Sequence, residues 1–269
     1  MTAELFSFEI MGRTITIYFY GVFLLFAVII GIITLYKELS RRNLETKRIL
    51  DNIFWILLFG VIGARIGYVI LHWDFYIRQP LEVLMIWQGG MTFTGGLVFG
   101  FGAAIIWLYY KNRKEMWPWL DTGMIAFVLG HAVGMLGSFA SGLDYGKETS
   151  LPWGVKITAL NDNILRHPTQ IYEFIAYLFS FIVLVLISNK IIKNKDTKLF
   201  PGFIFWLGLS ITFFIRFLVE FVRVSDQVLF NIGKFDFSYT HIISLIFLII
   251  GLTGLIYKEK KFIKINNLK

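Results

Sequence analysis

The chain lacks cysteine and has few prolines and few charged residues for its length. None of its 269 residues is cysteine, five are proline, and 16% are charged, whereas soluble domains carry roughly 25% charged residues. Without cysteine the protein cannot form a disulfide, bind a metal through thiolates or use a cysteine nucleophile. Because 57% of the residues are hydrophobic and the mean hydropathy is +0.67, water is not the main solvent of this chain.

Apolar runs of bilayer length recur along the sequence. A helix needs about 20 apolar residues to cross the hydrocarbon core. Seven candidate spans lie at about 16–36, 52–72, 93–110, 120–138, 169–188, 203–223 and 238–257. We therefore predict an all-α integral membrane protein, with residues 1–269 forming a single polytopic domain and an external-side loop region near 139–168. No basic start and small-residue cleavage site precede the first run, so we expect the first span to be retained.

Basic residues fall on alternate connections between these spans. They are Lys37, Arg41, Arg42, Lys47 and Arg48; Lys111, Arg113 and Lys114; Lys190, Lys193, Lys195 and Lys198; and Lys258, Lys260, Lys261, Lys264 and Lys269. Cytoplasmic loops are enriched in Lys and Arg, so this pattern predicts an external N-terminus and a cytoplasmic C-terminus. The net charge of +8 is then explained by topology, and no nucleic-acid partner is expected.

Three regions place ionisable residues where lipid should be. The second span contains Arg65, the sixth contains Arg216, Glu220 and Arg223, and the fifth begins with the segment 167–173. A charge at the centre of a membrane helix costs roughly 2.5–3.5 kcal/mol on insertion, so such residues usually face the interior and mark a functional site.

The spacing i, i+4, i+7 places Arg216, Glu220 and Arg223 along one helical face, where Glu220 can neutralise either arginine. Guanidinium groups suit the recognition of phosphate. The alternatives are a buried ion-pair network that holds helices together and, for Arg223, a side chain that extends to the membrane surface. If the site is functional, Arg65, Arg216 and Glu220 should converge on one internal cavity open toward lipid.

The fifth span begins like a helix N-terminus, with Pro168 in its first turn and Thr169, Gln170 and Glu173 following. His167 is either a cap or a functional residue. Tyr20 and Tyr172 have the character of interfacial anchors. The glycine-rich segment 89–96 permits close backbone approach or helix packing.

Taken in order, these segments resemble the prolipoprotein diacylglyceryl transferase family over nearly the whole chain. The similar segments are 20–21, 63–68, 89–96, 130–134, 145–147, 151–155, 167–173 and 216–223. The histidine-proline segment followed by the Arg/Glu/Arg helix is the most specific part.

The resemblance implies transfer of a diacylglyceryl group from phosphatidylglycerol to the lipobox cysteine of a prolipoprotein, in a bacterial inner membrane and without a metal or cofactor. Its partners would be phosphatidylglycerol and prolipoprotein signal peptides. Arg216, Arg65, His131 and Glu220 are the expected catalytic residues. The expected substrate-binding residues are Tyr20, Tyr68, Gly89, Gly90, Thr94, Ser138, Gly154, His167, Gln170, Tyr172, Glu173 and Arg223.

The sequence departs from the family pattern at five points. Thr94 stands where a histidine or tyrosine is usual, Met135 where an arginine is usual, Ser138 where an asparagine or cysteine is usual, and His241 where a glutamine is usual; Leu143 and Asp144 follow Gly142. His131 lies one helical turn before Met135 on the same face, and it is either a substitute base or a packed interior histidine. Two other readings remain open, an inactive lipid- or lipoprotein-binding paralogue and a small transporter.

Overall fold

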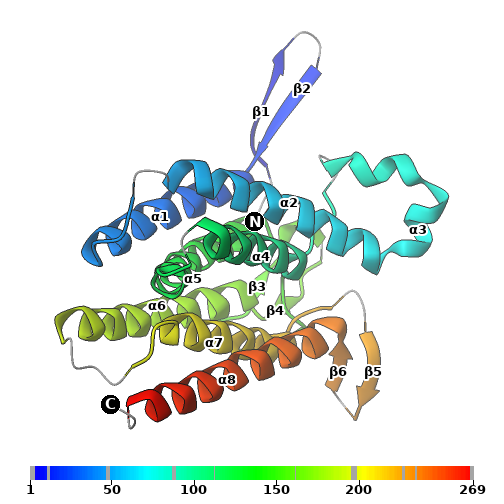
Figure 1. Cartoon of the computed structure of the whole chain (residues 1–269). Coiled ribbons are helices and arrows are strands. Elements are labelled where there is room, and N and C mark those ends of the chain that lie inside the picture. The colour runs from blue at the N-terminus through cyan, green and yellow to red at the C-terminus, as the bar shows by residue number, and fades with distance from the viewer. Residues whose placement is uncertain are drawn as a thin grey trace. The chain divides into compact units, whose positions relative to one another are not determined.

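The computed structural model of the chain describes residues 4–10, 13–46, 49–86, 89–111, 113–160, 162–194, 199–225, 228–233 and 235–266. Within these ranges, seven helices are long and apolar enough to cross a membrane (Figure 1). They are α1 (Phe19–Arg41), α2 (Ile49–Leu71), α4 (Phe93–Lys111), α5 (Met116–Ala140), α6 (Thr169–Lys193), α7 (Phe203–Glu220) and α8 (Tyr239–Asn266). The seven predicted spans are confirmed, and the chain has the architecture of a multi-pass membrane protein.

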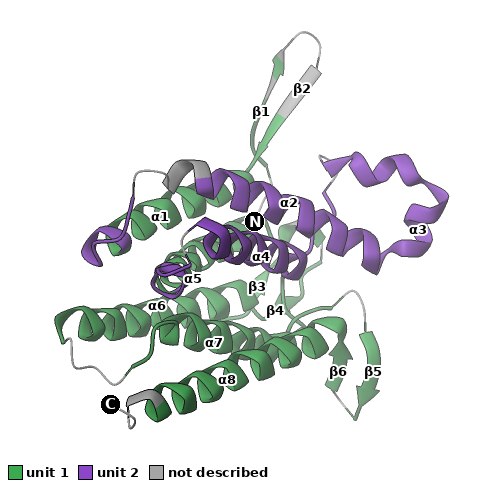
Figure 2. Cartoon of the chain, in the orientation of Figure 1, with its two compact units in different colours: residues 1–38, 121–269 green, residues 39–120 purple. Residues whose placement is uncertain are grey.

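The chain divides into two compact units, one of residues 1–38 and 121–269 and one of residues 39–120 (Figure 2). The smaller unit holds α2, α4 and, between them, the short helix α3 (Trp73–Arg78) and the 3-10 helix η1 (Pro80–Leu84). The larger unit holds α1, α5, α6, α7 and α8.

Glycines bring α2 and α4 together in the smaller unit. A Cβ atom on Gly96 would lie 3.3 Å from the Gly60 carbonyl oxygen, and one on Gly67 would lie 3.2 Å from the Gly95 Cα atom. Small residues allow such close backbone approach, which is how membrane helices gain packing contacts without a hydrophobic driving force. The prediction that glycines of segment 89–96 serve helix packing is confirmed for Gly95 and Gly96.

The N-terminus of α7 lies inside the larger unit and is capped by a carboxylate. The backbone N–H groups of Gly202 and Phe205 donate to the Asp121 side chain of α5 at 3.0 and 2.8 Å. The first N–H groups of a helix have no partner within it, and in a membrane an unsatisfied N–H costs several kcal/mol. Asp121 therefore meets a backbone requirement of α7.

In the described part of the chain, three two-stranded antiparallel sheets lie outside the spans, and the all-α prediction did not include them. They pair β1 (Glu4–Ile10) with β2 (Arg13–Tyr18), β3 (Val155–Lys156) with β4 (Leu165–Arg166), and β5 (Val228–Ile232) with β6 (Phe235–Ser238). A short 3-10 helix, η3 (Thr158–Leu160), lies between β3 and β4. These strands are too short to form an apolar run of bilayer length, so the hydropathy pattern does not reveal them.

The end of the sixth predicted span is corrected by the structure. Helix α7 ends at Glu220, whereas the span was predicted to continue to residue 223. Beyond it the chain pairs with the loop after α5, because Lys147 donates its backbone N–H to Val222 at 2.8 Å and Val224 donates to Tyr145 at 3.1 Å. Arg223 still donates its backbone N–H to the Val219 carbonyl at 3.1 Å, so it closes the last turn of α7 while pairing with the loop.

Candidate functional site

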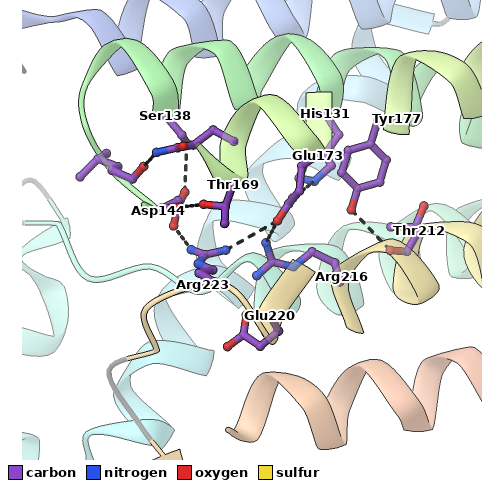
Figure 3. Close-up of polar contacts among 12 residues, drawn as sticks. His131, Ser138, Asp144, Thr169, Glu173, Tyr177, Thr212, Arg216, Glu220 and Arg223 are labelled. Carbon is purple, nitrogen blue, oxygen red and sulfur yellow. Dashed lines mark hydrogen bonds and ion pairs between the residues drawn. The ribbon is translucent and has the colours of Figure 1, made fainter. Parts of the chain in front are cut away.

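The helix ends of the larger unit carry a cluster of buried charges (Figure 3). Arg216 of α7 donates from Nη1 to Oε1 of Glu173 of α6 at 2.7 Å. The two side chains are 10% and 2% exposed. A buried pair of this kind is costly to break, since removing one partner leaves the other charge without compensation.

Glu173 lies at the centre of the cluster. Its Oε1 atom is 3.9 Å from Arg223 Nη1, and its Oε2 atom is 3.9 Å from His131 Nε2. The His131 ring is stacked on Phe127, with ring centroids 5.7 Å apart, and meets the Tyr177 ring edge-on at 4.5 Å. His131 is thus both a packed aromatic-type residue and the neighbour of the Arg216–Glu173 pair, which keeps both readings of this residue open.

Arg223 forms an ion pair with Asp144, and the alternative of an arginine that extends to the membrane surface stays a prediction. The other carboxylate oxygen of Asp144 accepts a hydrogen bond from the Ser138 hydroxyl at 3.0 Å. Asp144 has a positive φ of 59°, a conformation that Asp adopts more readily than most residues. Thr169 donates its hydroxyl to the Asp144 carbonyl oxygen at 2.5 Å, which fixes this turn to the start of α6.

Gly146 holds the loop in place from both sides. Its N–H donates to the His167 carbonyl at 2.9 Å, and it forms a bridge with Arg223. A Cβ atom there would lie 2.5 Å from His167 Cβ and 2.8 Å from the Val222 carbonyl oxygen. Only glycine fits between these backbones, and the resulting short pairing sets Arg223 beside Asp144.

Glu220 is held by the start of α8. The Ser238 hydroxyl donates to Glu220 Oε1 at 2.7 Å. Ser238 precedes α8, and its backbone N–H donates to His241 Nδ1 at 3.1 Å. This is half of a capping box, with a histidine where Glu or Gln usually sits, and it assigns the ring proton of a neutral His241 to Nε2. The serine hydroxyl is therefore directed to Glu220.

The predicted stripe of Arg216, Glu220 and Arg223 is corrected in one respect. Arg216 and Glu220 lie one turn apart on α7, but Arg223 lies beyond the helix end. The acidic partners of the two arginines, Glu173 and Asp144, come from α6 and from the loop after α5. Spacing along one helix cannot reveal partners on other elements.

A second group of predicted residues ties the loop to α6. Trp153 Nε1 donates to the Tyr172 hydroxyl at 2.9 Å, and that hydroxyl lies 3.1 Å from His167 Nδ1. The Gln170 amide donates to the Leu143 carbonyl. Pro168 was predicted to lie in the first turn of this helix. It is instead the N-cap of α6, immediately before the first turn.

Gly154 and Asp162 belong to the outer part of the same loop. Gly154 closes a turn onto the Leu151 carbonyl at 2.9 Å, and a Cβ atom there would lie 3.0 Å from Thr149 Cγ2. Arg166 donates to Asp162 at 2.7 Å, and this hydrogen bond lowers the pKa of Asp162. The loop is thus folded through its own contacts.

Arg65 belongs to the smaller unit and has a different environment. Its guanidinium donates to the carbonyls of Val83 at 2.9 Å, Glu82 at 2.5 Å, Gly89 at 2.6 Å, Gly90 at 3.0 Å and Met85 at 3.5 Å. Arginine has five N–H donors, and these five contacts engage them. The expectation that Arg65 offers them to a phosphate is not supported by these contacts, because they hold residues 82–85 and 89–90 against α2.

The remaining predicted residues are distributed over both units. Tyr20 lies in the first turn of α1 and is 40% exposed. Tyr68 is stacked on His72 with ring centroids 4.0 Å apart, Gly89 and Gly90 have φ values of +88° and +76°, and Thr94 lies in the first turn of α4. The predicted convergence of Arg65 with Arg216 and Glu220 stays a prediction, since the two units are described separately.

Three residues of the cluster were not chosen from the sequence. Ser238 and Gly146 lie in connections that look unremarkable, and Asp144 was noted only as a departure from the family. The available signals were an acidic residue four positions beyond the end of α5, and a serine three residues before His241 at the start of a predicted span.

Comparison with known proteins gives a consistent result. The sequence model of the prolipoprotein diacylglyceryl transferase family matches residues 6–257. The phosphatidylglycerol–prolipoprotein diacylglyceryl transferase of Finegoldia magna is 32% identical over 261 residues, covering 96% of this chain and 97% of the relative. The proteins of the same name from Wolbachia pipientis and Listeria monocytogenes are 31% and 28% identical, over 84% and 92% of this chain and 84% and 88% of their own lengths.

Proposed function

Because the chain belongs to the prolipoprotein diacylglyceryl transferase family, we propose that it transfers the diacylglyceryl group of phosphatidylglycerol to the lipobox cysteine of a prolipoprotein. The observation that supports this most strongly is the family match over nearly the whole chain. The buried charges around Arg216 offer chemistry suited to such a transfer.

The reaction replaces a carbon–oxygen bond by a carbon–sulfur bond. The cysteine sulfur attacks the glyceryl carbon that bears the phosphate, and glycerol phosphate leaves with the bonding electrons. The thiol proton passes to a base, and the leaving phosphate gains one negative charge. The attacking cysteine belongs to the substrate, so an enzyme without cysteine is chemically adequate.

Arg216 is the proposed phosphate contact, with Arg223 beside it. Fixed guanidinium groups stabilise negative charge that develops as a phosphate leaves. Before lipid binds, both arginines already face the carboxylates Glu173 and Asp144. Uptake of the thiol proton by a carboxylate of this cluster therefore removes one negative charge while the phosphate gains one.

Glu220 is the proposed proton acceptor, and His131 is the other candidate. Glu220 is 4% exposed and hydrogen-bonded to Ser238, so its carboxylate has a defined orientation. A base must lie within hydrogen-bond reach of the proton it takes, directly or through one water. His131 lies beside Glu173, from which it can exchange a proton with the Arg216 pair.

Arg65 is proposed as a positioning residue. Its contacts order the segment that carries Gly89 and Gly90, two of the proposed substrate-binding positions. The other proposed substrate-binding residues are those expected from the sequence. They are Tyr20, Tyr68, Thr94, Ser138, Gly154, His167, Gln170, Tyr172, Glu173 and Arg223.

An inactive lipid-binding protein is the second candidate, favoured by one specific observation. Met135 lies buried in α5 where the family usually carries an arginine, and a methionine cannot bind phosphate. The test uses purified protein, phosphatidylglycerol vesicles and a lipobox peptide, scored by mass spectrometry. We expect the peptide to gain the mass of one diacylglyceryl group; a peptide with serine in place of cysteine is the control. Lipid binding without any mass gain would establish the binding protein instead.

The protein is proposed to lie in the bacterial inner membrane as one polytopic domain, with its N-terminus outside the cytoplasm. The charge cluster lies at the ends of α6 and α8 opposite to those that carry Lys190 and Lys193, and Lys258 to Lys264. Because basic ends favour the cytoplasm, the cluster would face outward. A reporter fused after the C-terminus should be cytoplasmic and one inserted near Lys147 external; exchanged locations would reverse the proposed orientation.

A further inference from the structure

Hairpin β5–β6 presents apolar side chains along its length. Every residue of β5 is exposed, and four of the five, all but Asn231, are apolar. Successive side chains of a strand point to opposite faces, and past the register shift between Val228 and Phe230 this alternation puts Phe230 and Ile232 on one face of β5 and Asn231 on the other. A hairpin in water would alternate apolar and polar residues. Here one face carries the apolar pairs Phe230–Phe237 and Ile232–Phe235, and the opposite face carries the polar pair Asn231–Asp236.

The most exposed apolar residues lie at the tip. Ile232 and Phe235, on either side of the turn, are 60% and 57% exposed. The turn begins at Gly233, whose φ of +61° suits glycine. Lys234 lies between them in the sequence, and a lysine can keep its charge at the lipid headgroups while apolar neighbours enter the bilayer. Ile232 and Phe235 are therefore the part of the tip that would meet the acyl chains.

The hairpin is nevertheless well ordered at its base. Phe230 and Phe237 are stacked across the strands with ring centroids 5.2 Å apart, and Phe237 meets Phe221 edge-on at 5.6 Å. The exposed residues therefore do not belong to a collapsed or unpaired segment.

The carboxylate of the hairpin is neutralised. Asp236 of β6 accepts a hydrogen bond from Lys147 Nζ at 2.6 Å. An isolated carboxylate would resist transfer to an apolar surrounding, and the lysine from the loop after α5 removes this obstacle.

The apolar surface of the hairpin continues into a membrane-spanning helix. Ser238 ends β6 and Tyr239 begins α8, with no residue between them. The outward side chains of α8, including Ile242, Leu245 and Ile246, are 41–49% exposed. In a spanning helix these contact lipid, so the hairpin extends an existing lipid-facing surface.

Hairpin β1–β2 of the same unit provides a contrast. It also leads directly into a spanning helix, but β1 exposes Glu4, Ser7 and Glu9 beside the apolar residues Leu5 and Phe6. Charged and hydroxyl side chains at these positions suit contact with water or lipid headgroups. Position before a spanning helix therefore does not by itself produce an apolar hairpin.

We propose that hairpin β5–β6 inserts the apolar side chains on either side of its turn, Ile232 and Phe235, into the lipid bilayer, so that phospholipid is the partner of this surface. This interaction is separate from the transfer reaction and does not depend on it. It also sets the depth of the charge cluster, because Ser238 at the base of the hairpin is bonded to Glu220.

The absence of cysteine makes site-directed spin labelling direct. Ile232→Cys, Phe235→Cys and Leu229→Cys would each carry a nitroxide in the full-length protein, reconstituted in vesicles of phosphatidylethanolamine and phosphatidylglycerol. Ile246→Cys on α8 is the lipid-facing reference, and Ser7→Cys on β1 is the matched exposed reference on the other hairpin. Collision of each label with oxygen, which concentrates in lipid, is compared with collision with a water-soluble nickel chelate.

Labels at 232 and 235 should resemble the label at 246, with strong oxygen and weak nickel collision, while the label at 7 shows the reverse. Nickel collision at 232 and 235 as strong as at 7 would place the tip in water and overturn the proposal. Protection from both reagents would show a protein partner, such as a second copy or a bound peptide, and would overturn it equally. Because all labelled positions are exposed, they are expected to tolerate substitution, and position 229 provides an independent reading on the same hairpin.

Discussion

Arg65 and Arg216 are both buried guanidinium groups in membrane-spanning helices, yet their partners differ in kind. Arg65 donates to main-chain carbonyls of one short segment, whereas Arg216 donates to the carboxylate of Glu173. Carbonyl partners leave only if the segment refolds. A carboxylate partner can change its charge by taking up a proton, and it can then release the arginine to another anion.

Because of this difference, Arg65 is suited to holding the backbone in place, and Arg216 is suited to taking part in a reaction. Both arginines were predicted as functional residues because a charge in a membrane helix is costly. In the smaller unit the arginine binds main-chain carbonyls, and in the larger unit it binds an ionisable side chain. A guanidinium that holds a loop should be needed for folding, and one that faces a carboxylate should be needed for the reaction.

The largest effect is expected at Arg65. In Arg65→Met several carbonyls lose their donor, and each buried carbonyl left unpaired costs about 1–3 kcal/mol. Allowing for water that refills part of the space, we expect the free energy of unfolding to fall by about 3–5 kcal/mol. The measurement is unfolding in mixed micelles. Arg65→Lys should recover only part of the loss, since an ammonium has three donors without the planar geometry.

Arg78→Met is the control for this prediction, because Arg78 lies exposed on α3 in the same unit. We expect a change within about 0.5 kcal/mol. If Arg65→Met were as stable as Arg78→Met and lacked only transfer activity, the two buried arginines would have the same role and the comparison would fail.

In protein that folds, Arg216 should still affect the rate, beyond the folding cost of leaving Glu173 without its partner. For Arg216→Lys and Arg216→Ala we expect a loss of transition-state stabilisation of about 2–4 kcal/mol, with Ala worse than Lys. This corresponds to a rate lower by roughly 30-fold to 1000-fold. The measurement is the initial rate of diacylglyceryl transfer to a lipobox peptide, normalised to folded protein.

A double substitution distinguishes the phosphate role from a structural one. The structure identifies Glu173 as the acidic partner, so Arg216→Met is combined with Glu173→Gln, and in parallel with Glu220→Gln. If Arg216 only balances a carboxylate, removing both charges should restore folding and transfer together. A folded but inactive double variant would support the phosphate role, and recovered transfer would end it.

Glu220 provides the intermediate case, an ionisable group held by a neutral hydroxyl. Ser238→Ala removes a hydrogen bond to a charged group, and we expect a rate loss corresponding to about 1.5–3 kcal/mol. His241→Gln should stay close to the parent, because glutamine also accepts the N-cap N–H in a capping box, whereas His241→Leu should resemble Ser238→Ala.

The matched control for this series is Thr253→Ala, which deletes a hydroxyl that bonds only to the preceding turn of α8 among the described contacts. It should change rate and stability little. Equal losses in His241→Gln and His241→Leu would mean that the ring itself, and not its acceptor atom, is what the site requires.

Much of the fold follows from the sequence because its causes are local. A run of apolar residues either reaches the length of the bilayer or does not, and all seven predicted spans are found. The ends of those spans are less predictable. The sequence from Glu220 to Arg223 continues the helical pattern, but backbone bonds from Tyr145 and Lys147 end the helix, and the residues that make them are more than seventy positions away.

The candidate site was predictable in its residue types and not in its pairs. Arg216, Glu220 and Glu173 stand out because charge is costly in lipid, and His131 and Ser138 were named from the family resemblance. Asp144 and Ser238 did not stand out, because a carboxylate in a loop and a serine before a helix are ordinary features until another element lies against them.

The sequence by itself determined that the chain has seven apolar runs of bilayer length, which family it belongs to and which charged residues have to be accounted for, because hydropathy and residue order are properties of the chain. Only the tertiary structure decided that Glu173 faces Arg216, that Asp144 faces Arg223 and that Arg65 serves main-chain carbonyls. In a low-dielectric interior each buried charge must find a partner, and which partner lies within reach depends on how helices distant in sequence pack together.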